Sequence, residues 1–172
     1  MRRFAFALLL FCSTGAEAKA PLFDAFLAFC AATHADPDGV RAAVAGVHGR
    51  QTFPVGGAKS PATVWKPGRA LWVTIGAYDA GRSDREFCTV SSPPGDEASL
   101  AAAREWAAVA PNGHSGSTFA SYQFREVRGR HFAATLEDAA VRAAASDRPL
   151  WSLGVMRGRR GTFITLTPET PR

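Results

Sequence analysis

Two cysteines, Cys30 and Cys88, limit the fold of this chain more than any other feature of its sequence. The third cysteine, Cys12, lies in an N-terminal segment that we expect to be removed, which leaves an even pair. A chain that folds in an oxidising compartment is expected to join such a pair, whereas two separately buried thiols are the alternative. On the chain-entropy model the disulfide would stabilise the fold by about 4 kcal/mol at most. The sequence holds no C-x-x-C motif that would indicate redox catalysis.

Residues 1–18 have the three-part order of a secretory signal peptide. Arg2 and Arg3 precede an apolar run at residues 4–11, and the segment closes on small residues at Ala16 and Ala18. The apolar run is shorter than the roughly 20 residues that cross a bilayer as a helix. We therefore expect cleavage after Ala18, a periplasmic or secreted product, and no transmembrane segment in the mature chain. An N-terminal core helix is the alternative interpretation.

The length and charge of the mature chain restrict its class. Removal of residues 1–18 leaves 154 of 172 residues, which suits a single domain at 19–172. The formal net charge is +5, and it becomes +4 when Arg2, Arg3 and Glu17 are removed. This excess is too small to be typical of a nucleic-acid-binding protein, so no nucleic-acid partner is predicted.

Apolar residues at helical spacing predict the first helix. Pro21 suits a first helical turn, and Asp24, Ala25 and Ala28 fall on the face opposite the apolar residues. The apolar arc, which we expect to be buried, consists of Leu22, Phe23, Phe26, Leu27, Phe29 and Cys30.

Capping residues predict three further helices. Asp36-Pro37-Asp38 marks a helix start, because proline excludes helical geometry from the residue before it. This helix has an apolar stripe at Val40, Val44 and Val47 and should end near His48-Gly49. Asp96-Glu97 opens an alanine-rich helix through Ala110, and Thr135 caps a helix that continues to about Ala145.

Apolar residues at alternating positions predict the strands. They occupy residues 62–65, 70–78, 85–91, 121–127, 131–134, 150–156 and 162–167, and residues 52–61 are expected to form a loop. In 70–78 both faces are partly apolar, which suggests a central strand covered by helices on one side and loops on the other. The predicted fold class is α+β, an antiparallel sheet with helices mainly on one face and one disulfide.

One segment is similar to a catalytic motif. Gly113-His114-Ser115-Gly116-Ser117 differs at its fifth position from the G-x-S-x-G nucleophile elbow, and a helix precedes it where the motif requires a strand. The mature chain is also short for that hydrolase fold, and a glycine- and serine-rich surface loop explains the segment without a catalytic role. A small secreted hydrolase that uses Ser115, or a metal held by His114 and His131, is therefore the alternative function. No cofactor is predicted, because no phosphate-binding loop or zinc-finger spacing occurs.

Arginine is concentrated at the predicted turns. If several turns share one end of the sheet, their guanidinium groups would bind an anionic envelope component or an acidic protein surface. The alternative is that exposed turns of an arginine-rich chain simply carry arginine. We assign Trp72, Trp151 and Phe163 to the core, so base stacking is not indicated. The turn arginines are Arg69, Arg82, Arg128, Arg130, Arg157, Arg159 and Arg160, of which Arg128, Arg130, Arg157, Arg159 and Arg160 are the predicted binding residues.

The order of these features resembles a loose class of small secreted proteins of Gram-negative bacteria that have no assigned function. The resemblance covers residues 23–109 and rests on four features: Cys30 before an Asp-Pro helix, a Trp65 to Gly68 hairpin, Cys88 on a short strand, and an alanine-rich helix after it. It implies an oxidising compartment and contributes no active-site residues. Because the sequence holds no coherent catalytic set and its predicted turns carry arginine, we expect an exported, non-enzymatic binding or accessory domain.

Overall fold

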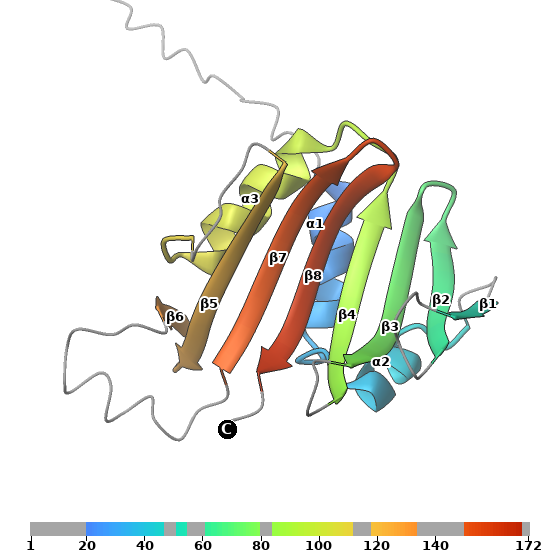
Figure 1. Cartoon of the computed structure of the whole chain (residues 1–172), viewed down its shortest axis with the longest axis horizontal. Helices are drawn as coiled ribbons and strands as arrows, with labels where there is room; N and C mark the ends of the chain where they lie inside the picture. Colours follow the sequence, from blue (N-terminus) through green and yellow to red (C-terminus); the bar gives the residue numbers. More distant parts are fainter. Residues whose placement is uncertain are drawn as a thin grey trace, which may run out of the picture.

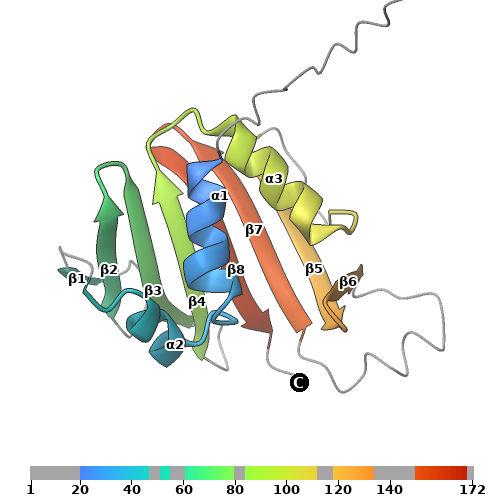
Figure 2. The same ribbon diagram turned by 180° about the vertical axis from the view of Figure 1, so that it is seen from behind.

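The computed structural model describes residues 20–46, 51–54, 61–79, 84–111, 118–133 and 150–169. Within these ranges, eight antiparallel strands form one sheet in the order β1-β2-β3-β4-β8-β7-β5-β6. The helices lie on one face of this sheet (Figures 1 and 2). The predicted fold class is confirmed.

Most strands begin and end within a few residues of the predicted positions. They are β1 (Gln51–Pro54), β2 (Pro61–Gly68), β3 (Leu71–Asp79), β4 (Asp84–Ser92), β5 (Phe119–Val127), β6 (Arg130–Ala133), β7 (Leu150–Gly158) and β8 (Gly161–Glu169). The prediction of a loop at residues 52–61 was wrong for β1, which pairs with β2 from Gln51↔Val64 to Pro54↔Pro61. The sequence of β1 shows no clear alternation of apolar and polar residues. This short edge strand forms through its hydrogen bonds to β2, which its own sequence does not reveal.

The first helix changes its pitch before the disulfide. The α-helix α1 (Pro21–Phe26) continues as a π-helical turn, η1 (Leu27–Ala31), in which the amide of Ala32 donates to the carbonyl of Leu27 over 3.0 Å. The wider turn rotates Cys30 towards the sheet and Phe29 to the edge of the buried face. Cys30 is fully buried, whereas Phe29 is half-buried and Ala25 is buried, contrary to the predicted arc.

The two remaining described helices have the predicted caps. In α2 (Pro37–Ala43) the Asp36 carboxylate accepts a 2.7 Å hydrogen bond from the amide of Gly39. In α3 (Glu97–Ala107) the Asp96 carboxylate accepts one of 3.1 Å from Ser99. Both helices are shorter than predicted, and α3 ends where Ala108 adopts a left-handed conformation. The predicted helix at residues 135–145, like Val47 and His48-Gly49, lies outside the described residues.

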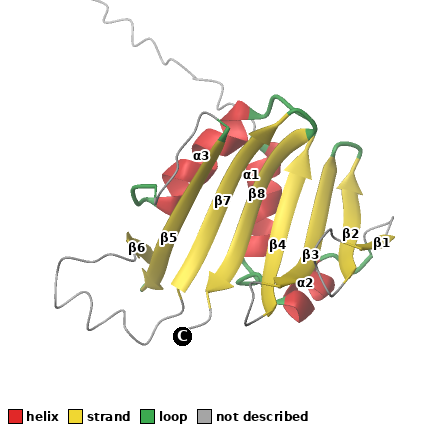
Figure 3. Ribbon diagram, in the orientation of Figure 1, coloured by secondary structure: helices red, strands yellow, loops and turns green. Residues whose placement is uncertain are grey.

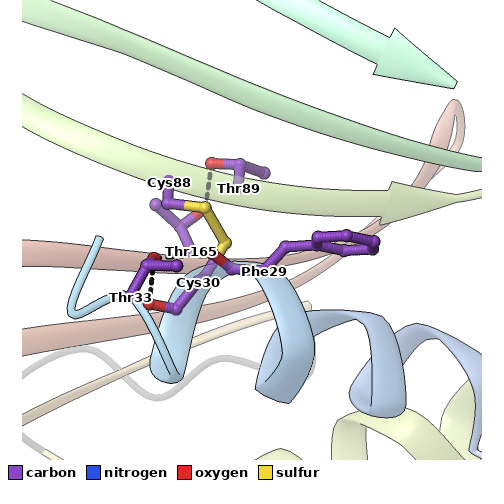
Figure 4. Close-up of a disulfide and its surroundings, with 6 residues drawn as sticks. All are labelled: Phe29, Cys30, Thr33, Cys88, Thr89 and Thr165. Atoms are coloured by element: carbon purple, nitrogen blue, oxygen red, sulfur yellow. Dashed lines mark hydrogen bonds between the residues drawn. A yellow bond between two sulfur atoms is a disulfide. The ribbon is translucent and has the colours of Figure 1, made fainter. Parts of the chain in front are cut away.

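The core lies between the helices and one face of the sheet. Leu22 and Phe26 of α1 are fully buried together with alternate residues of the strands below them, such as Val90 and Ile164. The Cys30–Cys88 disulfide joins η1 to β4 within this layer, with 5.5 Å between the two Cα atoms (Figure 4). The predicted cysteine pairing is confirmed, and the distance is typical of a disulfide.

The opposite face of the sheet is not covered by any described helix or loop (Figures 1 and 3). Trp72 and Phe163 lie on this face, because they alternate with the fully buried Val73 and Ile164. Their assignment to the core was therefore wrong, whereas Trp151 is buried as predicted. The predicted loop cover over β3 is also missing from the described part of the chain.

Candidate functional site

The arginine-bearing turns lie at two opposite ends of the sheet. β5 and β7 pair from Phe119↔Met156 to Arg125↔Leu150, so the end of β5 is far from the end of β7. The β5–β6 turn with Arg128 is therefore roughly 35 Å from the β7–β8 turn, given the rise per residue of a strand. In Figure 1 the β5–β6 turn is at the bottom and the β7–β8 turn at the top. The five predicted binding arginines do not form one group.

Three of these arginines share one end with the β2–β3 turn. Arg157, one residue before the end of β7, forms an ion pair with Glu97, in which its Nη1 donates to Oε1 over 2.9 Å. Arg159 and Arg160 form the β7–β8 turn and are exposed. Arg69 is exposed on the β2–β3 turn at the same end, at a distance of about three strand spacings, or roughly 14 Å. We call Lys66, Arg69, Arg157, Arg159 and Arg160 the basic end.

Most of the positive charge of the basic end has no ion-pair partner in the described part of the chain. Within the described ranges, Arg69, Arg159 and Arg160 form no ion pair. The two acidic residues at the start of α3 already have partners. Asp96 accepts the capping hydrogen bond of α3, and Glu97 forms an ion pair with Arg157. Guanidinium groups with free donors suit carboxylate or phosphate oxygens.

Lys66 connects the basic end to the uncovered face. Its Nζ lies 5.7 Å from the centre of the Trp72 ring, which is within the range of a cation–π contact. The two residues are on neighbouring strands, Lys66 on β2 and Trp72 on β3. The charge at the turns thus continues onto the sheet face.

Sequence reasoning did not identify two residues as exposed apolar members of the uncovered face, although one of them, Met156, lay in a predicted strand. Phe119 and Met156 are paired across β5 and β7, and their exposed fractions are 42% and 41%. The predicted strands began at Ser121 and ended at Met156, so Phe119 was left outside. Their alternation with the buried Ala120 and Val155 is the signal that would have placed them on this face.

The other end of the sheet holds Arg128 and Arg130 beside an open pocket. The pocket has a volume of about 440 Å³ and is lined by Trp106, Ala108, Glu126, Gly129, Arg130 and His131. The Nδ1 atom of His131 lies 2.8 Å from the Trp106 carbonyl oxygen. Since a carbonyl only accepts, Nδ1 carries the proton and Nε2 is the acceptor when the ring is neutral.

The histidine of this pocket is held by aromatic neighbours. The His131 ring is 4.4 Å from the Trp106 ring and 4.2 Å from the Phe124 ring, measured between centroids. A second histidine, His34, has its Nε2 3.8 Å from Oε2 of Glu126. No group of three or more histidine, cysteine, aspartate or glutamate residues suited to a metal ion occurs among the described residues.

Of the residues in the hydrolase hypothesis, His131 alone lies within the described ranges. His114 and Ser115 lie outside the described ranges, and so does Arg82. Neither a serine nucleophile nor a metal bound by His114 and His131 can therefore be built from the described residues.

The comparisons with known proteins found no match. No family model matches the chain, and no curated protein or solved structure is significantly similar to it. Among the described helices, none has the length and apolar character that a membrane crossing requires.

Proposed function

We propose that the chain is exported and, after loss of residues 1–18, acts as a non-enzymatic binding domain for an anionic partner. The partner is an anionic component of the cell envelope or an acidic protein surface. The observation that carries this proposal is the basic end, where Arg159 and Arg160 are exposed and have no ion-pair partner among the described residues, whereas the nearby Arg157 is neutralised by Glu97. Exposed arginines without carboxylate partners have their donors available for an incoming anion.

The sequence and the disulfide support export. Residues 1–18 have the order of a signal peptide, and a buried disulfide suits a protein that folds in an oxidising compartment. Intact-mass measurement of the protein from its native fractions checks this part. The mass should correspond to a chain that begins at Lys19 and lacks two hydrogens relative to the reduced form. A full-length chain in the cytosolic fraction would contradict export.

The binding part is tested with two matched double variants of the mature protein. Arg159→Gln with Arg160→Gln removes two charges from the basic end, whereas Arg128→Gln with Arg130→Gln removes two from the opposite end. On a phosphocellulose column the first variant should elute at clearly lower salt than the wild type. It forms fewer ion pairs with the phosphate groups of the column, so less salt is needed to screen them. The second should elute close to the wild type.

The comparison separates a local site from a general effect of charge. Equal shifts for both variants would show that only net charge matters, and no shift for the first would exclude the basic end. Both pairs of arginines are exposed, so the melting temperature should stay nearly constant in each variant.

A further inference from the structure

The uncovered face of the sheet carries an ordered row of apolar side chains beside the basic end. The pairing register aligns Phe119 with Met156, Met156 with Phe163, Phe163 with Ser91, and Ser91 with Trp72. The row thus crosses five neighbouring strands, β5, β7, β8, β4 and β3. We call Phe119, Met156, Phe163 and Trp72 the apolar row. Met156 and Phe163 are two residues from the β7–β8 turn, Trp72 is the second residue of β3, and Phe119 is the first residue of β5.

A row of hydroxyl groups follows immediately. The register aligns Thr74 with Thr89, Thr89 with Thr165, Thr165 with Gly154, and Gly154 with Ser121. This hydroxyl row lies about 7 Å from the apolar row, two residues further along each strand. The hydroxyl oxygens of Thr89 and Thr165 are 2.8 Å apart and share one hydrogen bond, which leaves further donor and acceptor capacity on the pair.

We propose that this face binds an anionic glycan, with sugar rings on the apolar row and acidic groups at the basic end. This inference rests on the proposed function and specifies its ligand. A sugar ring offers an apolar C–H surface to an aromatic ring and hydroxyl groups at its rim. The apolar row supplies such a surface, and the hydroxyl row supplies partners for the rim. The carboxylates or phosphates of the glycan then meet Arg159 and Arg160.

The members of the apolar row differ in their availability. Phe119 and Met156 are the large hydrophobic residues that are exposed in the described part of the chain. Phe119 lies over Gly154 on the neighbouring strand, which has no side chain. A Cβ atom at Gly154 would be 3.7 Å from Cε2 of Phe119. Trp72 is already in contact with the Lys66 cation, so it forms the border of the platform.

Charge favours an anionic glycan over a second copy of the chain. The basic end adjoins the apolar row, so a copy docked on the same face with its strands in the same direction would bring arginines of like charge together. An anionic ligand instead neutralises them. Aromatic rings beside basic residues are also found in proteins that bind single-stranded nucleic acid, and this possibility is decided by the test.

The test compares polygalacturonate, a polymer of acidic sugars, with three other probes. They are polyphosphate, which is anionic and lacks sugar rings, dextran, which has uncharged sugar rings, and single-stranded oligothymidylate. The mature wild type should bind polygalacturonate more tightly than any of these. Phe119→Ser with Met156→Ser should raise the Kd for polygalacturonate about tenfold and leave the Kd for polyphosphate unchanged, because aromatic contacts contribute on the order of a factor of ten. Val127→Ser is the control, since it changes a half-buried residue at the far end of β5.

The outcomes distinguish this inference from the proposed function. If Arg159→Gln with Arg160→Gln weakens polygalacturonate binding and the Phe119 and Met156 variant does not, anion binding stands and the glycan platform is overturned. If neither variant weakens binding, both proposals fail. Tighter binding of oligothymidylate than of polygalacturonate would assign the face to nucleic acid. A dimer that dissociates in the Phe119 and Met156 variant, with polygalacturonate binding unchanged, would assign it to a second copy.

Discussion

Arg157 at the end of β7 donates a hydrogen bond of 2.9 Å to Glu97 in the first turn of α3, and this ion pair joins the sheet to the helical layer. The two side chains are about half exposed, at 47% and 55%. The pair removes one guanidinium group from the basic end. The neighbouring Arg159 and Arg160 have no such partner among the described residues.

Glu97→Gln is predicted to strengthen anion binding. The uncharged amide no longer neutralises Arg157, so the variant should elute from phosphocellulose at higher salt than the wild type. The cost in stability should be at most about 1 kcal/mol, since exposed ion pairs and helix-terminal charges each contribute little. Glu105→Gln is the matched control, because it removes the same charge from the exposed surface of α3 away from Arg157. An equal gain in both variants would assign the effect to net charge.

The disulfide is predicted to supply a large share of the stability. Replacement of Cys30 and Cys88 together by alanine should lower the free energy of unfolding in urea by roughly 2–5 kcal/mol, the range for a native disulfide. Both cysteines are fully buried, so a reductant without denaturant should leave the native protein oxidised. Protein isolated without reductant that contains two alkylatable thiols in its native state would contradict this prediction.

Local features of the fold were predictable from the sequence. Asp36 and Asp96 were recognised as helix starts because their caps depend on neighbouring residues alone. The buried face of β7, with Trp151, follows from alternation within the strand, whereas Phe163 of β8 was assigned to the wrong face. The pitch change at η1 was not predictable, since no local residue pattern distinguishes a π-helical turn from an α-helical one in this segment.

The arrangement of the site was not predictable for a different reason. β4 pairs with β8, and β7 pairs with β5, so the sheet order depends on contacts between distant parts of the chain. The order fixes which turns share an end, and it separates Arg128 from Arg159. It also aligns Phe119, Met156 and Phe163 in one row, although they come from three different strands.

The cap of α2 gives a prediction on a single side chain. Asp36→Ala should lower the free energy of unfolding by about 1 kcal/mol, because the amide of Gly39 loses its acceptor. Asp38→Ala, in the same first turn, is the control. Asp38 contacts the exposed Arg41 and caps nothing, so its loss should cost only a few tenths of a kcal/mol. Thermal and urea unfolding of the two variants side by side measure the difference, and equal losses would show that the cap bond contributes nothing.

Replacement by alanine should change the stability of the protein differently at the two glycines that flank the β7–β8 turn. A Cβ atom at Gly161 would lie 2.7 Å from the backbone carbonyl oxygen of Ser92, which belongs to the neighbouring strand β4. The backbone must therefore shift, and Gly161→Ala should destabilise the protein by about 1–3 kcal/mol. A Cβ atom at Gly158 would meet its nearest atom at 3.6 Å, so Gly158→Ala should be neutral or slightly stabilising. Because the turn also holds Arg159 and Arg160, phosphocellulose elution should change for Gly161→Ala and stay constant for Gly158→Ala. If Gly161→Ala unfolds at the same urea concentration as the wild type, β8 does not approach β4 closely enough at Gly161 to exclude a Cβ atom.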